Sequence, residues 1–185
     1  MKFFKNIYWS IISPANLFKA WEIFKADKRN KTDVAEFERN LEQNVFALYR
    51  ELISGEYRHG PYTAFWIHDP KRRRIHKATV RDRILHHALF RVLNPIFEPM
   101  FIPTSFSCRI GKGTHRGVDF LAQAIRKVSR NYTRRCFVLK CDVRKFFDSV
   151  DHVVLTEILE HRVKDGEAKK LLREIVDSYS SDERV

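Results

Sequence analysis

The feature of the sequence that most limits its fold is a short apolar run at residues 136–143, CFVLKCDV. A run of this length and composition is typical of a buried β-strand. A buried strand needs neighbouring strands, and the rest of the chain supplies few segments that could pair with it. We therefore expect further sequence on the carboxyl side to complete the sheet.

A long amphipathic helix is predicted upstream of this run. Apolar residues recur at steps of three and four between Val34 and Leu52. Asp33 and Glu36 have the spacing of a capping box, and Gly55 stands where a glycine commonly ends a helix.

Residues 63–77 change to a β-type pattern. TAFWIH at 63–68 is rich in β-forming side chains, Asp69 and Pro70 form a typical turn pair, and RRRIHKA can return as a second strand. The sequence thus predicts a basic β-hairpin.

The remaining segments are mostly helical in pattern. With so few strands, the fold class we expect is α+β with helices outnumbering strands. The further expected helices are 16–25, 81–93 with an interruption at Pro95, 117–132, 151–162 and 167–179.

The composition points to a polyanionic partner. The 185 residues include 35 Lys and Arg against 23 Asp and Glu, a formal net charge of +12. Such an excess favours nucleic acid, although a basic surface can also serve solubility and loose association. Three cysteines without a CxxC pair favour a reducing cytoplasm, and no apolar stretch approaches the 18 residues of a membrane span.

Asp142 is the most informative single residue, because it lies at the exit of the predicted strand. Phosphoryl-transfer enzymes use aspartates at strand ends to hold Mg²⁺ with substrate phosphates, and the carbonyl of Val143 could join such a site. The alternative is that Asp142 caps the following turn, with Asp148 or Asp151 capping the next helix. An aspartyl-nucleophile phosphatase is disfavoured, because Arg144 stands where a second acid would be needed.

Short motifs in a fixed order give these residues a context. Along the chain they are EYRHGPY, DPKRRRI, RDRILHHAL, NPIFEPMF, SFSCRIGKGTHRGV and DVRKFFDSVDH. This series, between about residues 16 and 155, resembles the fingers and palm motifs of reverse transcriptases in the group II intron, retron and diversity-generating retroelement branch. The pieces GPY, HHAL, CR and KGTH are most similar to the diversity-generating enzymes.

The resemblance implies the fingers subdomain of a right-hand polymerase followed by the first part of the palm. Residues 1–32 would be a helical lead-in, 33–135 the fingers, and 136–185 the start of the palm. The family's Tyr-x-Asp-Asp turn and its thumb do not occur in the sequence. The resemblance therefore implies a chain truncated before the palm hairpin and the thumb.

The resemblance also implies roles for single residues. Asp142 and Val143 would hold Mg²⁺, or Mn²⁺ in its place, and Phe147 would lie under the nucleotide sugar and discriminate against a 2′-hydroxyl by shape. Lys71 and Arg73 on the hairpin would bind the incoming triphosphate. Residues expected to contact template or primer are Arg81, Arg83, Arg109, Lys112 and His115.

Some of these assignments have alternatives. Arg81 and Arg83 flank Asp82, so an internal Arg–Asp pairing is an equal interpretation. The adjacent Phe146 and Phe147 cannot both face the same way, and we expect one of them to be in the core. Arg72 and Arg74 belong on the other face of an alternating strand, toward solvent or template.

The implied parent activity is that of an RNA-directed DNA polymerase, a nucleotidyltransferase that adds deoxynucleotides to a DNA primer on an RNA template. With one of the metal-binding carboxylates present, we expect no polymerisation by this polypeptide unless an accessory protein or a separate palm and thumb completes it. Two alternatives stay open: a non-catalytic basic module that binds nucleic acid, and an interaction domain whose apolar strand docks a partner chain.

Overall fold

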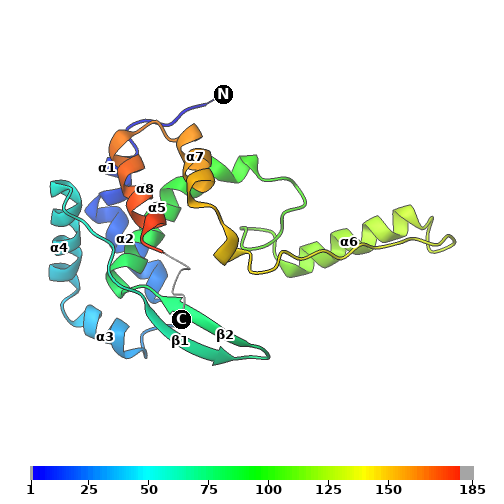
Figure 1. Cartoon of the computed structure of the whole chain (residues 1–185), viewed down its shortest axis with the longest axis horizontal. Coiled ribbons are helices and arrows are strands. Elements are labelled where there is room, and N and C mark those ends of the chain that lie inside the picture. Colours follow the sequence, from blue (N-terminus) through cyan, green and yellow to red (C-terminus); the bar gives the residue numbers. More distant parts are fainter. Residues whose placement is uncertain (1, 180–185) are drawn as a thin grey trace. The chain divides into compact units, whose positions relative to one another are not determined.

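The computed structural model describes residues 2–179. These form two compact units (Figure 1). Unit 1 combines the chain up to Ile96 with the segment from Val150 onward, and unit 2 comprises Phe97–Ser149. The prediction of a helix-rich α+β chain with a small sheet is confirmed, since the described residues contain one two-stranded sheet.

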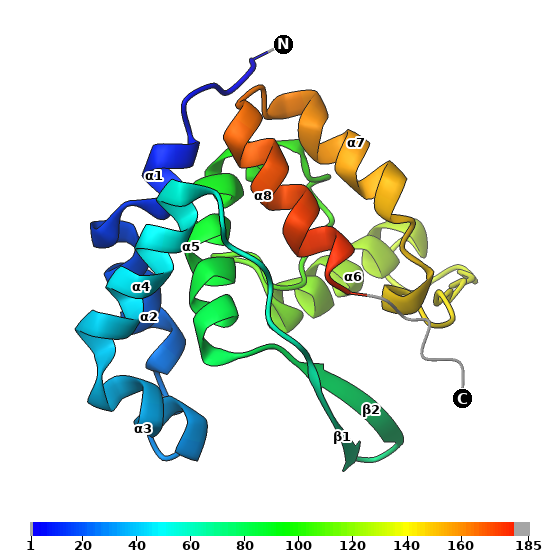
Figure 2. The ribbon, with the colours of Figure 1, turned by 60° about the vertical axis from the view of Figure 1, so that its left-hand side comes forward.

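Unit 1 begins with helices that pack against one another on the amino-terminal side of the chain (Figure 2). Ser13 caps the second of them by accepting a hydrogen bond from the Asn16 backbone N–H, and Pro14 takes the first helical position, where its missing N–H costs nothing. The helices are α1 (Tyr8–Ile12), α2 (Pro14–Lys25), α3 (Thr32–Arg39) and α4 (Leu41–Ser54).

The predicted long helix from Val34 to Leu52 is wrong in one respect, because Asn40 divides it into α3 and α4. Asn40 leaves helical geometry with φ −124° and ψ 40°, and the Asn44 side chain donates to the Phe37 carbonyl across the break. The proposed capping box is also wrong, since Lys31 is the N-cap and makes no side-chain cap bond. The expected stop is confirmed: Gly55 adopts a left-handed conformation with φ 73° after α4.

Helix α5 (Val80–Phe97) runs through the expected interruption at Pro95. The proline removes one backbone hydrogen bond near the carboxyl end of the helix, where few bonds remain to be lost. Ile96 beyond it is buried, so packing offsets that loss.

Helices α7 (His152–Arg162) and α8 (Gly166–Asp177) lie side by side and complete unit 1 (Figure 2). Asp151 caps α7 by accepting from two backbone N–H groups, which confirms the capping interpretation for this residue. Asp165 caps α8 and also accepts from the Tyr8 backbone N–H at 2.9 Å. The amino-terminal segment is further attached here, because the Phe4 backbone pairs with residues 162–164.

The hydrophobic core lies entirely within unit 1. It is built from aliphatic and aromatic side chains on α1, α2, α4, α5 and α8, which bury the apolar stripes that the sequence periodicity predicts. The largest fully buried side chains include Trp21, Phe24, Leu48, Leu52 and Ile84.

The predicted β-hairpin is confirmed. Strands β1 (Thr63–His68) and β2 (Arg72–Lys77) pair antiparallel, with Phe65 opposite Ile75 and Trp66 opposite Arg74. Both strands extend away from the helices of unit 1, and every β1 side chain is exposed (Figure 1).

Unit 2 contains α6 (Thr114–Val128) and two short 3₁₀ turns, Glu98–Met100 and Phe147–Ser149. The predicted buried strand at 136–143 is wrong, because these residues form no strand and Phe137 is 94% exposed. A strand needs a partner for its backbone groups, and none of the described residues supplies one, so water solvates them instead.

None of the described helices is long and apolar enough to cross a membrane.

Candidate nucleic-acid interface

The hairpin presents two chemically different faces, because side chains alternate along each strand. The register places Arg73 on the same face as Phe65, Ile67 and Ile75. The opposite face carries Trp66, Arg72, Arg74 and His76.

Lys71 and Arg73 lie on the part of the hairpin farthest from the core. Lys71 is in the turn and Arg73 in β2, and both are exposed. Neither makes an ion pair within the described part of the chain. By contrast Lys77, at the base of β2, donates to Asp33 at 2.9 Å. Lys71 and Arg73, which we call the outer cations, are therefore available to an external anion.

Trp66 and Arg72 form a stacked pair on the second face. The Arg72 guanidinium lies 4.1 Å from the centre of the Trp66 ring, and the ring is half exposed. A flat aromatic ring beside a cation is the arrangement on which proteins stack unpaired bases. Trp66 was not among the residues predicted from the sequence, although a tryptophan in a basic hairpin could have signalled this.

Asp82 fixes the base of the hairpin. Its side chain is fully buried, and it accepts hydrogen bonds from the Tyr57 hydroxyl at 2.8 Å, the Thr79 hydroxyl at 2.5 Å and the Gly60 backbone N–H at 3.1 Å. Burial favours a higher pKa for Asp82, but the hydrogen bonds from Thr79 and Tyr57, together with the nearby His59 and Arg81, outweigh burial and hold the pKa below its ordinary value. A Cβ on Gly60 would meet Asp82 Oδ2 at 2.9 Å, so only glycine lets the backbone approach this closely.

A stack of rings extends this polar network. The imidazole rings of His59 and His86 lie nearly parallel with their Nε2 atoms 3.2 Å apart, and the Tyr62 ring also stacks with His59. The His59 backbone N–H donates to Glu174 on α8 at 2.9 Å. Burial, helped by the neighbouring His59, lowers the pKa of His86 to about 4, so this imidazole is neutral at pH 7.

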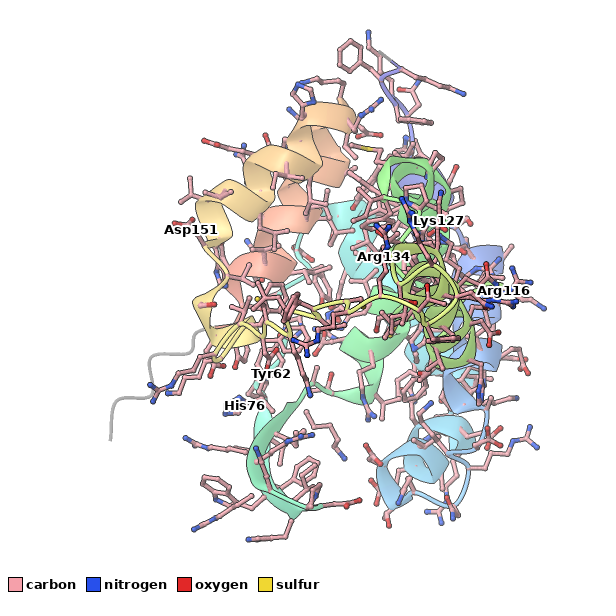
Figure 3. The ribbon with its side chains drawn as sticks, turned by 90° about the vertical axis from the view of Figure 1, so that its right-hand side faces the viewer. Tyr62, His76, Arg116, Lys127, Arg134 and Asp151 are labelled. Atoms are coloured by element: carbon pink, nitrogen blue, oxygen red, sulfur yellow. The ribbon has the colours of Figure 1, made fainter. Side chains whose placement is uncertain are left out.

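The hairpin base also contacts the end of α8. The Tyr62 hydroxyl lies 3.2 Å from Ser178 Oγ, and His76 Nδ1 lies 3.3 Å from the Tyr179 hydroxyl. Figure 3 shows Tyr62 and His76 at the root of the hairpin. Contacts from α5 and α8 thus hold the direction in which the two strands project.

Arg81 and Arg83 are used inside unit 1. Arg81 donates to Glu51 and to the Arg58 carbonyl, each at 2.5 Å. Arg83 donates to Asp33 at 2.6 Å and lies over the Phe24 ring. The internal Arg–Asp pairing left open for these arginines is present, since Arg83 pairs with Asp33 and Arg81 Nε also lies 3.5 Å from Asp82 Oδ1.

Two of the expected nucleic-acid contacts in unit 2 shape its loop. Arg109 binds Glu98 at 2.7 Å and the carbonyls of Ile102 and Ser105, which leaves its side chain 10% exposed. Lys112 donates to the Pro103 carbonyl at 2.5 Å. These two side chains hold the loop closed.

His115 is exposed in the first turn of α6, and Gly113 before it has φ 108°, a value that favours glycine. This imidazole is therefore open to solvent.

Asp142 and Phe147 lie on an exposed stretch of unit 2. One Asp142 oxygen accepts from the backbone N–H of Val143 at 3.1 Å, and Val143 itself is exposed. Phe147 is 82% exposed and meets the Phe146 ring edge to face at 5.4 Å. The expectation that one of the two phenylalanines is in the core is wrong, because both rings are exposed.

The donors at this position fit a hard cation in kind. A carboxylate and a backbone carbonyl are the oxygen ligands that Mg²⁺ and Mn²⁺ prefer. Among residues 2–179 no group of three or more His, Cys, Asp or Glu side chains could hold an ion.

Comparison with protein-family models gives no match. Among curated proteins, Protein YkfC of Escherichia coli K12 is 27% identical over 124 residues, which are 66% of this chain and 32% of that protein. The group II intron-encoded protein LtrA of Lactococcus lactis subsp. cremoris is 23% identical over 134 residues, 71% of this chain and 21% of LtrA. The mitochondrial nuclear intron maturase 1 of Arabidopsis thaliana is 27% identical over 114 residues, 55% of this chain and 15% of the maturase.

These similarities relate the chain to group II intron-encoded proteins and intron maturases, and they support a reverse-transcriptase-related family. The chain spans no more than a third of the length of each of these relatives.

Proposed function

We propose that this chain is the fingers region and the beginning of the palm of an RNA-directed DNA polymerase. In this proposal it binds an RNA template with a DNA primer, together with the triphosphate of an incoming deoxynucleotide. The observation that carries the proposal is the hairpin, whose outer cations Lys71 and Arg73 have no internal partner among the described residues while its base is fixed by the buried Asp82. The related intron-encoded proteins support it.

The chemistry of the two cations suits a triphosphate. An arginine guanidinium donates two parallel hydrogen bonds to a phosphate, and a lysine ammonium supplies a mobile point charge. Because Lys71 lies in the turn and Arg73 two residues along the chain in β2, both can meet neighbouring phosphates of one ligand. Holding the phosphates orders the nucleotide without any covalent chemistry by the protein.

Asp142 and the Val143 carbonyl would hold Mg²⁺ or Mn²⁺ together with ligands from outside the described residues. When bound, such an ion supplies positive charge that offsets the charge developing on the transferred phosphate. In the proposal, the exposed ring of Phe147 provides a rigid surface beneath the nucleotide sugar, so that a 2′-hydroxyl would clash.

The test measures two kinds of binding with the same protein. Fluorescence anisotropy follows a labelled RNA–DNA primer–template, and a fluorescent deoxynucleoside triphosphate reports on nucleotide binding. The double variant Lys71→Ala/Arg73→Ala should bind the triphosphate at least roughly 100-fold more weakly, since hydrogen bonds to charged groups contribute about 1.5–3 kcal/mol each.

The matched control is Lys31→Ala/Arg39→Ala, which removes two exposed cations at the two ends of α3 and should leave nucleotide binding unchanged. If the hairpin variant binds the triphosphate as tightly as the wild type, the proposal that Lys71 and Arg73 bind the incoming nucleotide is refuted. Primer–template binding that persists in that case would favour a non-catalytic nucleic-acid-binding module.

A further inference from the structure

The carboxyl end of α6 and the turn that follows carry a cluster of cations that the proposed function does not use. We call this cluster the basic turn. All of its members are exposed, and Figure 3 labels Lys127 and Arg134 within it. The basic turn consists of Arg126, Lys127, Arg130, Arg134 and Arg135.

No carboxylate within residues 2–179 neutralises the basic turn. None of its five side chains makes an ion pair there, whereas Arg81, Arg83 and Arg109 elsewhere in the chain are all paired with acids. The dipole of α6 accounts for the placement of Arg126 and Lys127 in its last turn. It does not account for the three arginines beyond the helix end, so an external anion is the better explanation for the cluster.

The backbone of the basic turn is held in an unusual conformation. Arg130, Asn131 and Tyr132 are three consecutive non-glycine residues with positive φ values of 48°, 60° and 66°. Non-glycine residues in this conformation cost about 1–3 kcal/mol each and persist only where the surrounding structure imposes it. They concentrate at functional positions.

Here the surroundings are specific. The Ser129 side chain is buried and accepts from the Tyr132 backbone N–H at 2.8 Å, and the Asn131 backbone N–H donates to the Arg126 carbonyl at 2.7 Å. The Arg126 side chain also donates to the Asn131 side-chain oxygen at 2.9 Å. The cations are therefore presented by a defined turn.

The surface beside three of these cations is shallow and wide open to solvent. It is lined by Gln123, Arg126, Lys127, Arg130 and Asn131. Its lining combines cations with two amide side chains and no apolar residue. That combination suits an anion that also accepts hydrogen bonds.

We propose that the basic turn is a second nucleic-acid contact surface, which binds the phosphate backbone of RNA. This inference rests on the proposed function in that it assumes an RNA-binding chain. Four of the five cations are arginines, whose planar guanidinium groups match phosphate oxygens two at a time. The adjacent Tyr132, which is 67% exposed, offers a ring on which an unpaired base can stack. Such a surface reads the backbone and not the sequence.

The test is the salt dependence of RNA binding by the whole chain. On a single strand, the slope of log K against log salt concentration falls in magnitude by about 0.7 for each phosphate that the protein no longer neutralises. The triple variant Arg126→Gln/Arg130→Gln/Arg134→Gln should therefore reduce the slope by about 2 units with a labelled single-stranded RNA. Because Arg126 also bonds to Asn131, the variant Lys127→Gln/Arg135→Gln is measured as well and should reduce it by about 1.4 units.

The matched control is Lys31→Gln/Arg39→Gln/Arg50→Gln, which removes the same charge from exposed positions on α3, α4 and the segment before α3. The proposal holds if the basic-turn variants reduce the slope as expected and this control reduces it by at most a few tenths. Equal reductions in both would mean that net charge alone is responsible, and the proposal would be overturned.

Two further outcomes separate this inference from the function proposed above. If the Lys71→Ala/Arg73→Ala variant loses triphosphate binding while the basic-turn variants keep the full slope, the basic turn is refuted and the hairpin assignment stands. If the wild-type chain binds phosphatidylserine vesicles but no RNA, the basic turn serves a lipid surface and the proposal is refuted.

Discussion

The buried carboxylate of Asp82 makes a sharp prediction about the stability of unit 1. In the variant Asp82→Ala, the Tyr57 hydroxyl and the Gly60 backbone N–H lose the acceptor that they now share. An unpaired buried donor costs about 1–3 kcal/mol, while the Thr79 hydroxyl can rotate toward another partner. We expect Asp82→Ala to lower the free energy of unfolding by about 4 kcal/mol, the middle of the range for two unpaired buried donors.

The assay is urea unfolding followed by circular dichroism. Tyr57→Phe removes one of the donors and should cost about 1–2 kcal/mol, and the two changes together should cost less than their sum because they share a hydrogen bond. Asp119→Ala, at an exposed position of α6, is the control and should change the stability by no more than about 0.5 kcal/mol. A loss below about 1 kcal/mol in Asp82→Ala would refute the view that this carboxylate holds the hairpin base.

Three other measurements test the fold and the hairpin. The folded state lowers the pKa of His86 to about 4, so the neutral imidazole's contribution to stability is fully present above the unfolded pKa of about 6.5 and is lost as the pH falls from there toward about 4. The free energy of unfolding should fall by at most roughly 3 kcal/mol over this range. His86→Gln should flatten the plot of stability against pH but leave the smaller drop due to His87, whose pKa burial also lowers. Trp66→Ala should weaken binding of single-stranded RNA by roughly 5- to 150-fold in a fluorescence titration, as expected for one stacked base, and unchanged affinity would argue against stacking. Leu48→Ala should cost about 2–5 kcal/mol in urea unfolding, whereas Phe137→Ala should cost less than about 0.5 kcal/mol, and similar costs would contradict the placement of the core in unit 1.

The helices of unit 1 and the hairpin could be predicted because local pattern determines them. Leu48 and Leu52 fall on a regular apolar stripe, and the β-forming run before Asp69 and Pro70 predicts both strands. The break at Asn40 could not be predicted because the apolar stripe continues across it on both sides. Asn40 leaves helical geometry, but the apolar residues before and after it keep helical spacing, so the sequence pattern gives no sign of the break.

Tertiary contacts explain the other differences between sequence and structure. Asp33 has the spacing of a capping residue, but Lys77 and Arg83 from distant segments occupy its carboxylate. Burial favours a higher pKa for Asp33, but the hydrogen bonds and positive charges of Lys77 and Arg83 together outweigh burial and lower the pKa. The role of Asp82 was missed for the same reason, since a central residue of RDR gives no sign in the sequence that Tyr57 and Gly60 will lie against it.

The predicted strand at 136–143 shows the limit of composition as a guide. Phe137 and Leu139 are typical strand residues, yet a strand exists only where a second chain segment accepts its hydrogen bonds. The roles given to Asp142, Val143 and Phe147 come from motif spacing and stay predictions, because they depend on ligands that the described residues do not provide.

The most direct test of the account is to map where RNA touches this chain. A 4-thiouridine-labelled RNA template annealed to a DNA primer is cross-linked to the whole chain at near-physiological salt, and the modified peptides are identified by mass spectrometry. We predict cross-links in the hairpin at 63–77 and in the basic turn at 126–135. Cross-links confined to the surface of α3 and α4, or their absence from both predicted segments, would contradict the assignment of this chain as a nucleic-acid-binding fingers region.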